Sequence, residues 1–204
     1  MARYNSINEG SSGKVGNVVT YKMYGKSYMR SMPGQYTDKK SEKQLAQRQK
    51  MQLVNDFLGA FTNVLRITFQ KEAVGRSAYA AAKSYNLLHA IGGEYPEQYI
   101  DFTKALVSIG SVILPSNLSV KRINNGLLFN WENDEFGNLS DTLFVTVKGR
   151  SKQYVEYKQT EAQRKDESYT WKMDFTENEQ YDVWLIFRDY KERGFSKSVW
   201  LGLV

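Results

Sequence analysis

The side chains that most often carry catalysis are scarce in this sequence. The 204 residues include no cysteine and a single histidine, His89. Without cysteine there can be no disulfide, no thiolate nucleophile and no cysteine-bound zinc or iron–sulfur cluster. A serine–histidine triad would have to use His89, but the G-x-S-x-G nucleophile motif is absent. His89 follows the apolar pair Leu87–Leu88, and we interpret it as a half-buried structural residue.

Two short acidic stretches could support acid–base chemistry or bind a hard cation. They are Asn133-Asp134-Glu135 and Asp166-Glu167. Both fall in predicted turns, where Asn and Asp satisfy the backbone of the turn itself. We therefore predict a protein that is not an enzyme, with no catalytic residue, no metal and no cofactor.

A glycine–lysine pair near the N-terminus, Gly13-Lys14, does not form a nucleotide-binding loop. The Walker motif requires G-x-x-x-x-G-K-[ST] between a strand and a helix. Here Gly10 lies too close to Gly13, Val15 replaces the hydroxyl residue, and a hairpin follows. The sequence shows no site for a small-molecule substrate.

Basic and tyrosine side chains alternate between residues 22 and 30. On a continuous extended strand they would share one face, although the turn expected near Gly25 disturbs that parity. Such a face can pair with phosphates and stack on bases, which makes nucleic-acid binding one alternative function. The candidate contact residues are Lys22, Tyr24, Lys26, Tyr28 and Arg30.

The elements that position these residues begin with a β-hairpin and two helices. Alternating runs at 15–23 and 26–32 predict the hairpin, with its turn at Tyr24-Gly25. A capping pattern at 41–44 and apolar residues at three- and four-residue spacing predict one helix from about 41 to 69. A second helix is predicted from Ser77 to about Ile91. A strand is expected at 99–108.

After Pro115 the pattern becomes purely β. Seven short alternating runs separated by polar turns indicate a two-sheet sandwich of the immunoglobulin type. The runs are 118–120, 127–131, 143–147, 154–157, 169–173, 181–187 and 195–201. The chain is therefore predicted to be an α+β protein, with a hairpin and helical domain at 1–114 and a β-sandwich domain at 115–204.

The second part resembles a fibronectin type III or related immunoglobulin-like module. The resemblance rests on a core tryptophan, Trp131, and on Phe175 six residues before Tyr181. It implies that Tyr181 forms a tyrosine corner, with its hydroxyl bonded to upstream backbone. This likeness concerns the fold and implies no activity.

Strand parity also predicts an outward apolar patch on this module. If Tyr181, Val183, Leu185 and Phe187 point into the sandwich, their neighbours point out. The patch would consist of Phe144, Trp184, Ile186 and Trp200. Large exposed apolar patches are rare, so we expect either the N-terminal part or another subunit to cover it, with a slight preference for the former.

The whole chain also resembles an uncharacterised family of bacterial proteins of about this length, classed as a domain of unknown function. The matching segments include Gly13-Lys-Val-Gly16, Tyr28-Met-Arg30-Ser31, Glu42-Lys-Gln-Leu-Ala-Gln-Arg48 and Tyr99-Ile-Asp-Phe-Thr-Lys104. At the hairpin turn, where family members carry Trp-Lys-Gly, this chain has Met23-Tyr24-Gly25. The resemblance implies no activity.

Charge completes the sequence-based picture. Residues 1–115 carry 15 Lys and Arg against 8 Asp and Glu, whereas residues 116–204 carry 13 against 14.

No stretch reaches the roughly 20 apolar residues of a membrane span, and no signal peptide is recognisable. Cytoplasmic localisation is therefore the default expectation, and association with a particle is the alternative.

The function favoured by the sequence is a non-enzymatic structural or protein-interaction role, self-assembling or within a larger phage-like or extracellular particle. The partner is then another copy or another protein. Nucleic-acid binding through the basic half and carbohydrate binding through exposed aromatic residues are the alternatives.

Overall fold

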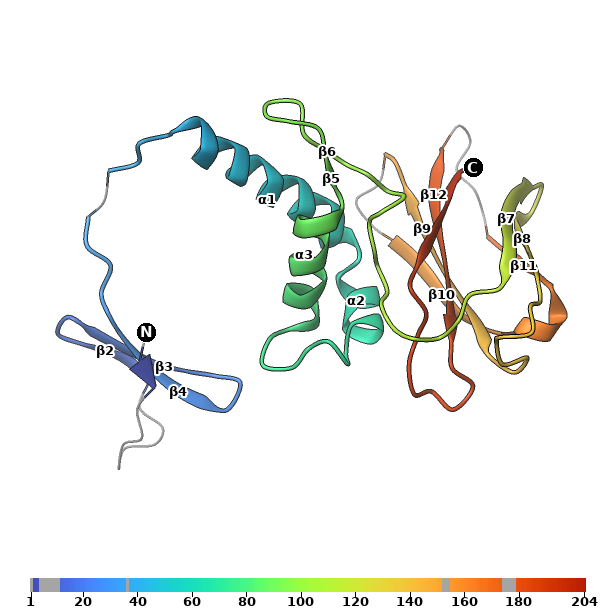
Figure 1. The fold of residues 1–204 in the computed structure, drawn as a ribbon, viewed down its shortest axis with the longest axis horizontal. Helices are drawn as coiled ribbons and strands as arrows, with labels where there is room; N and C mark the ends of the chain where they lie inside the picture. The colour runs from blue at the N-terminus through green and yellow to red at the C-terminus, as the bar shows by residue number, and fades with distance from the viewer. Residues whose placement is uncertain (1, 4–11, 36, 152–154, 174–178) are drawn as a thin grey trace. The chain divides into compact units, whose positions relative to one another are not determined.

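The computed structural model describes residues 2–3, 12–35, 37–151, 155–173 and 179–204. It confirms a mixed α+β architecture with a large β portion (Figure 1). The chain divides into two compact units, unit 1 (Met1–Glu42) and unit 2 (Lys43–Val204). We describe each unit by itself. The division at residue 115 drawn from the sequence stays a prediction.

Unit 1 is a small antiparallel sheet with strand order β1-β4-β3-β2. The predicted hairpin is present as its two central strands, and the outer strands extend it. The strands are β1 (Ala2–Arg3), β2 (Gly13–Val15), β3 (Val18–Met23) and β4 (Lys26–Ser31). Tyr24 and Gly25 connect β3 to β4, both with positive φ (50° and 74°). This is the two-residue turn whose twist matches that of the paired strands.

Unit 2 begins with three helices, because the segment expected to form one helix divides in two. The helices are α1 (Glu42–Ala60), α2 (Thr62–Thr68) and α3 (Ala78–His89). At the division, the Thr62 hydroxyl donates to the Gly59 carbonyl at 2.8 Å, and the Phe61 amide donates to Leu58 O three residues back at 3.0 Å. A side chain and a tighter turn thereby satisfy these two carbonyl groups at the C-terminal end of α1.

The second predicted helix is confirmed, including its N-cap. The Ser77 hydroxyl accepts a hydrogen bond from the amide of Ala80 at 3.1 Å. The prediction of a long strand at 99–108 is wrong. A two-residue ribbon of β5 (Ile91–Gly92) and β6 (Tyr99–Ile100) is followed by a turn in which Asp101 accepts from the amide of Thr103.

The remaining chain forms two antiparallel sheets. The first has the order β11-β8-β7 and the second the order β10-β9-β12-β13. Their strands are β7 (Ser116–Ile123), β8 (Gly126–Glu132), β9 (Thr142–Gly149), β10 (Val155–Gln163), β11 (Ser168–Lys172), β12 (Tyr181–Arg188) and β13 (Val199–Leu203). Each overlaps one of the seven predicted runs, although β10 extends well beyond its run and β13 begins later than predicted. The predicted positions Tyr154 and Phe175 lie outside the described residues.

Two apolar cores share the four-stranded sheet, whose two faces are both covered. One core lies between the sheets and contains Trp131, Val145 and Leu185. The other lies between the same four-stranded sheet and the helices, and contains Phe57, Phe61 and Trp184. In Figure 1 the helices accordingly lie on one side of β9 and β12 and the three-stranded sheet on the other.

One arginine is fully buried at an end of the sheets. The Arg164 guanidinium donates to the Ile113 carbonyl and lies 3.4 Å from an oxygen of Asp134. It also stacks over Phe187, with its Cζ 5.2 Å from the ring centroid. Burial lowers the pKa of Arg164, and burial likewise raises the pKa of the nearby Asp141 carboxyl. Arg164 therefore joins the loops at this end to the core.

None of the helices in the described residues is long and apolar enough to cross a membrane.

Candidate interaction surfaces

The five basic and tyrosine residues singled out between 22 and 30 do not share one face. The two-residue turn sets Met23 opposite Lys26, and pairing then runs outward from that pair. Directly opposed residues of antiparallel strands project to the same side. Lys26, Tyr28 and Arg30 thus lie on one face, Lys22 lies on the other, and Tyr24 lies in the turn. The predicted single face is corrected because the turn shifts the parity.

A more extensive basic surface results from this register, and we call it the basic face. Tyr21 and Tyr28 form its centre, with their rings stacked at a centroid distance of 5.6 Å. The strand register also places Lys14 of β2 on this face, because Lys14 opposes Val19 of β3. The basic face consists of Lys14, Val19, Tyr21, Met23, Lys26, Tyr28 and Arg30. Residues 10–37 contain no acidic residue, so nothing within these strands neutralises its charge.

The other side of the sheet, which we call the opposite face, is built from small and apolar side chains. Val15 and Val18 oppose each other, and Thr20 opposes Met29. The residues that share this face are Val15, Val18, Thr20, Lys22, Ser27, Met29 and Ser31. Among the described residues of unit 1, none is buried on either face.

The second predicted patch is covered by the chain's own helices. Phe144, Trp184 and Ile186 are fully buried in the core beneath α1 and α2. Trp184 contacts Phe61 edge to face, with a distance of 5.0 Å between the ring centroids. Trp200 is half-buried at the margin of this core and donates its Nε1–H to Asp182 at 3.1 Å. These contacts cover the patch from within the chain, as the preferred prediction stated. The three buried residues therefore do not form a partner surface.

The burial of tryptophan side chains also weakens the hypothesis that they bind sugars. Trp131, Trp171 and Trp184 are buried, and Trp200 is half-buried. A sugar ring stacks on an accessible aromatic face, which the three buried side chains do not offer.

The polar residues considered for catalysis hold turns and loops. Asp134 accepts from Phe136 N and Arg164, and Asp166 accepts from Gln163 N at 2.7 Å. His89 is exposed rather than half-buried, and its ring lies against that of Tyr85 at 4.5 Å. In the described part of the chain, no group of three or more His, Asp or Glu side chains is placed to bind a metal.

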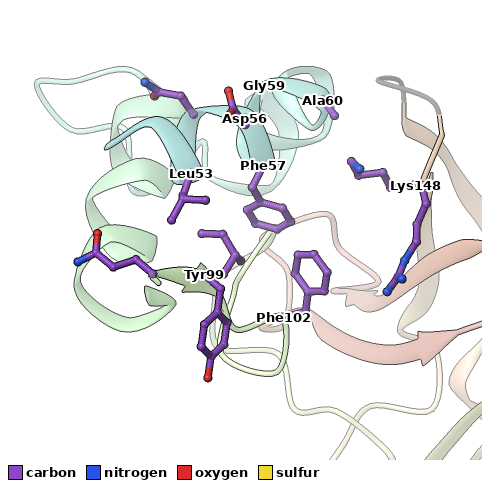
Figure 2. Close-up of a pocket in the computed structure, with 12 residues that line it drawn as sticks. Leu53, Asp56, Phe57, Gly59, Ala60, Tyr99, Phe102 and Lys148 are labelled. Atoms are coloured by element: carbon purple, nitrogen blue, oxygen red, sulfur yellow. The ribbon is translucent and has the colours of Figure 1, made fainter. Parts of the chain in front are cut away.

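A cavity of about 630 Å³ opens beside α1, and we call it the α1 pocket. Figure 2 shows Leu53 and Phe57 of α1 on one wall, and Tyr99 and Phe102 below them. Phe57 and Phe102 contact each other at a centroid distance of 5.6 Å. The pocket therefore has a mixed lining, in which three aromatic side chains adjoin aliphatic and polar ones.

Two cations, Lys148 and Arg150, close one side of the α1 pocket (Figure 2 labels Lys148). Lys148 shares the strand parity of Phe144, so it projects toward the helices. Arg150 Nε lies 3.4 Å from Asp182 Oδ2, whereas Lys148 forms no hydrogen bond or ion pair with any described residue. Lys148 was not among the residues predicted from the sequence, although a lysine at a core-facing position of an apolar strand is a signal of this kind.

Comparison with known proteins places the chain in a family but suggests no activity. No curated protein matches the sequence. A solved structure titled "Myokine structure" is 17% identical over 46% of this chain and 94% of that chain, with a TM-score of 0.36, which is too low to support an argument. A family profile described as "Family of unknown function (DUF6266)" matches residues 10–202. The chain belongs to the DUF6266 family.

Proposed function

We propose that this protein is a non-enzymatic structural or interaction protein that assembles with further copies of itself through unit 1. The observation that carries the proposal is that the four-stranded sheet of unit 1 has no buried side chain among its described residues. A sheet is stable when at least one face is packed against another layer. The described residues of unit 1 form no such layer.

Charge decides which face takes a second copy. Two basic faces brought together would oppose Lys14, Lys26 and Arg30 to one another, and like charges at contact distance destabilise a complex. The opposite face carries Lys22 as its one cation, together with Val15, Val18 and Met29. We therefore assign self-association to the opposite face, where two sheets can stack at a spacing of about 10 Å.

The test is the mass of the chain in solution, measured by light scattering during gel filtration. The wild-type protein should have the mass of two or more chains at micromolar concentration, and Met29→Glu should have the mass of one chain. Arg30→Glu is the control, because it introduces the same carboxylate one residue along β4 but on the basic face, with a net charge change of −2 rather than −1. A wild-type mass of one chain would reject the proposal, as would equal disruption by both variants.

A second candidate function, single-stranded nucleic-acid binding, is favoured by the basic face alone. Stacked tyrosines surrounded by cations can contact bases and phosphates together. This function predicts the reverse effect of the same two variants: Arg30→Glu should abolish oligonucleotide binding, and Met29→Glu should leave it unchanged. Binding should also fall steeply between about 50 and 200 mM salt. Absence of binding at the lower salt concentration would exclude it.

We also propose that residues 115–204 form an immunoglobulin-like or fibronectin type III-like module. The support is its seven strands in sheets of three and four, with Trp131 buried between them. Tyr181 opens β12 as a tyrosine corner would, and the Arg122 guanidinium lies 5.9 Å from its ring centroid. A closely superposing experimental structure of this region would test the assignment.

A further inference from the structure

We propose that the α1 pocket binds a small aromatic carboxylate, that is, a flat ring system carrying one carboxyl group. This site lies wholly within unit 2 and is independent of the assembly proposed for unit 1. The inference follows from the size of the cavity, its three aromatic lining residues, and a lysine that has no hydrogen-bond or ion-pair partner among the described residues.

The size and lining suit a ligand of this kind. Cavities of about 300–1,000 Å³ with apolar walls and a few polar groups are typical of small-molecule sites, and this one measures about 630 Å³. Phe57, Phe102 and Tyr99 contribute three aromatic rings. Aromatic rings attract one another in offset or edge-to-face arrangements, which favours a flat aromatic ligand.

The ring of Tyr99 is positioned by a glycine on the neighbouring strand. Its ring lies so close to Gly92 of β5 that a Cβ at that position would come within 2.6 Å of the ring carbon Cζ. Although packed there, the side chain keeps 56% of its surface exposed. A large, exposed and positioned aromatic ring is available for stacking.

The charge at the side of the pocket selects an anion. Lys148 and Arg150 face one acidic lining residue, Asp56 on α1. Asp182 partly neutralises Arg150, but its carboxylate is also bonded to Trp200. Lys148 is half-buried, and its ammonium group has no hydrogen-bond or ion-pair partner among the described residues, although Asp182 opposes it in the pairing of β9 and β12. One carboxylate on the ligand would supply that missing partner.

Calorimetric titration of the full chain with 2-naphthoate and with 2-naphthamide tests the proposal. The two probes share the ring system and differ in charge. At low salt the naphthoate should bind about fivefold more tightly, which is the effect of one half-exposed ion pair. Lys148→Gln should remove that preference while leaving naphthamide binding unchanged. Tyr99→Ala should weaken both probes.

The matched control is Lys121→Gln, which removes the same charge from an exposed position on β7. It should leave both affinities unchanged. Near-ultraviolet circular dichroism will show that each variant is folded. The proposal is overturned if naphthoate fails to bind at millimolar concentration, if naphthamide binds equally well, or if Lys121→Gln weakens naphthoate as much as Lys148→Gln does.

Discussion

The buried side chain of Asn86 pairs with the backbone of Leu106 as another peptide group would. Its Nδ2 donates to the Leu106 carbonyl at 2.9 Å, and its Oδ1 accepts from the Leu106 amide at 3.0 Å. The same Nδ2 also donates to Ala82 O within α3. One amide thereby joins α3 to a segment with no regular partner strand and leaves no buried polar group unpaired there.

Replacing this amide should destabilise unit 2 strongly. Asn86→Leu would leave the amide and carbonyl of Leu106 buried without partners, at a cost of about 3 kcal/mol in the free energy of unfolding. Leu88→Ala, an exposed position on the same helix, should change it by less than about 0.5 kcal/mol. Urea unfolding followed by circular dichroism measures both. A similar effect of the two changes would contradict the role assigned to Asn86.

The edge-to-face contact between Phe61 and Trp184 should appear as an energetic coupling. Phe61→Leu and Trp184→Leu should each destabilise the protein, and together they should lose about 1 kcal/mol less than the sum of the single effects. Phe61 and Trp131 lie in different cores, so the corresponding pair should be additive. Denaturant unfolding of both double-mutant cycles provides the measurement, and additivity for Phe61 and Trp184 would show that the contact contributes nothing.

Two glycines should respond in opposite ways to the same substitution. A Cβ at Gly137 would lie 2.1 Å from Cζ of the fully buried Arg164, so Gly137→Ala should cost about 1–3 kcal/mol. At Gly59 in α1 a Cβ meets no heavy atom within 4 Å, so Gly59→Ala should stabilise by roughly 0.5–1 kcal/mol. Thermal unfolding will separate them, and stabilisation by Gly137→Ala would show that the contact with Arg164 is not restrictive.

The turn of unit 1 contains a correctable strain. Tyr24 has a φ of 50° and is largely exposed, so its ring contributes little burial to offset the left-handed backbone. Tyr24→Asn should stabilise the hairpin by about 1 kcal/mol, because Asn-Gly is the preferred pair for this turn. Slower hydrogen exchange of the Tyr21 and Tyr28 amides, which form a hydrogen-bonded pair across the hairpin, would reveal it. Tyr24→Ala, which keeps the strain, should give no such slowing.

Acid should remove the contribution of one ion pair in the loop after β12. Arg193 donates to the Asp189 carboxylate at 2.9 and 3.0 Å and is the main cause that lowers its pKa from 3.8 to about 2. Since the folded pKa is the lower one, the stabilisation is present above about pH 4 and disappears as the pH falls through 2.

Asp189→Asn should therefore lower the melting temperature at pH 7, and its curve should converge with that of the wild type near pH 2. Glu161→Gln, at an exposed position on β10, serves as the control. A difference between the Asp189 variant and the wild type that is constant from pH 7 to pH 2 would refute the assignment.

Local sequence pattern was sufficient wherever one residue's neighbours determine its environment. Ser77 caps α3 because its hydroxyl reaches an amide three residues away. Alternation along β12 correctly separated Leu185, which faces the other sheet, from Trp184, which does not. It could not show what covers Trp184, because the covering residues Phe57 and Phe61 are more than 100 positions earlier in the chain.

The errors arose where a single contact changes the register or ends an element. The Thr62 hydroxyl closes α1, yet the apolar spacing continues through this break and so predicts one helix. The turn at Tyr24 moves Lys22 to the other face of its sheet. The α1 pocket was not foreseen because Tyr99 and Lys148 come from different elements, and only the fold brings them to one cavity.

The position of Trp184 beneath α1 and α2 has a consequence for how the protein is made. The helices leave the ribosome well before β12 is synthesised, so the apolar side chains of Phe57 and Phe61 must wait for their partner strand. Exposed apolar surface on an incomplete chain promotes aggregation. Production of this protein should therefore depend on chaperones during translation more than its modest length would suggest.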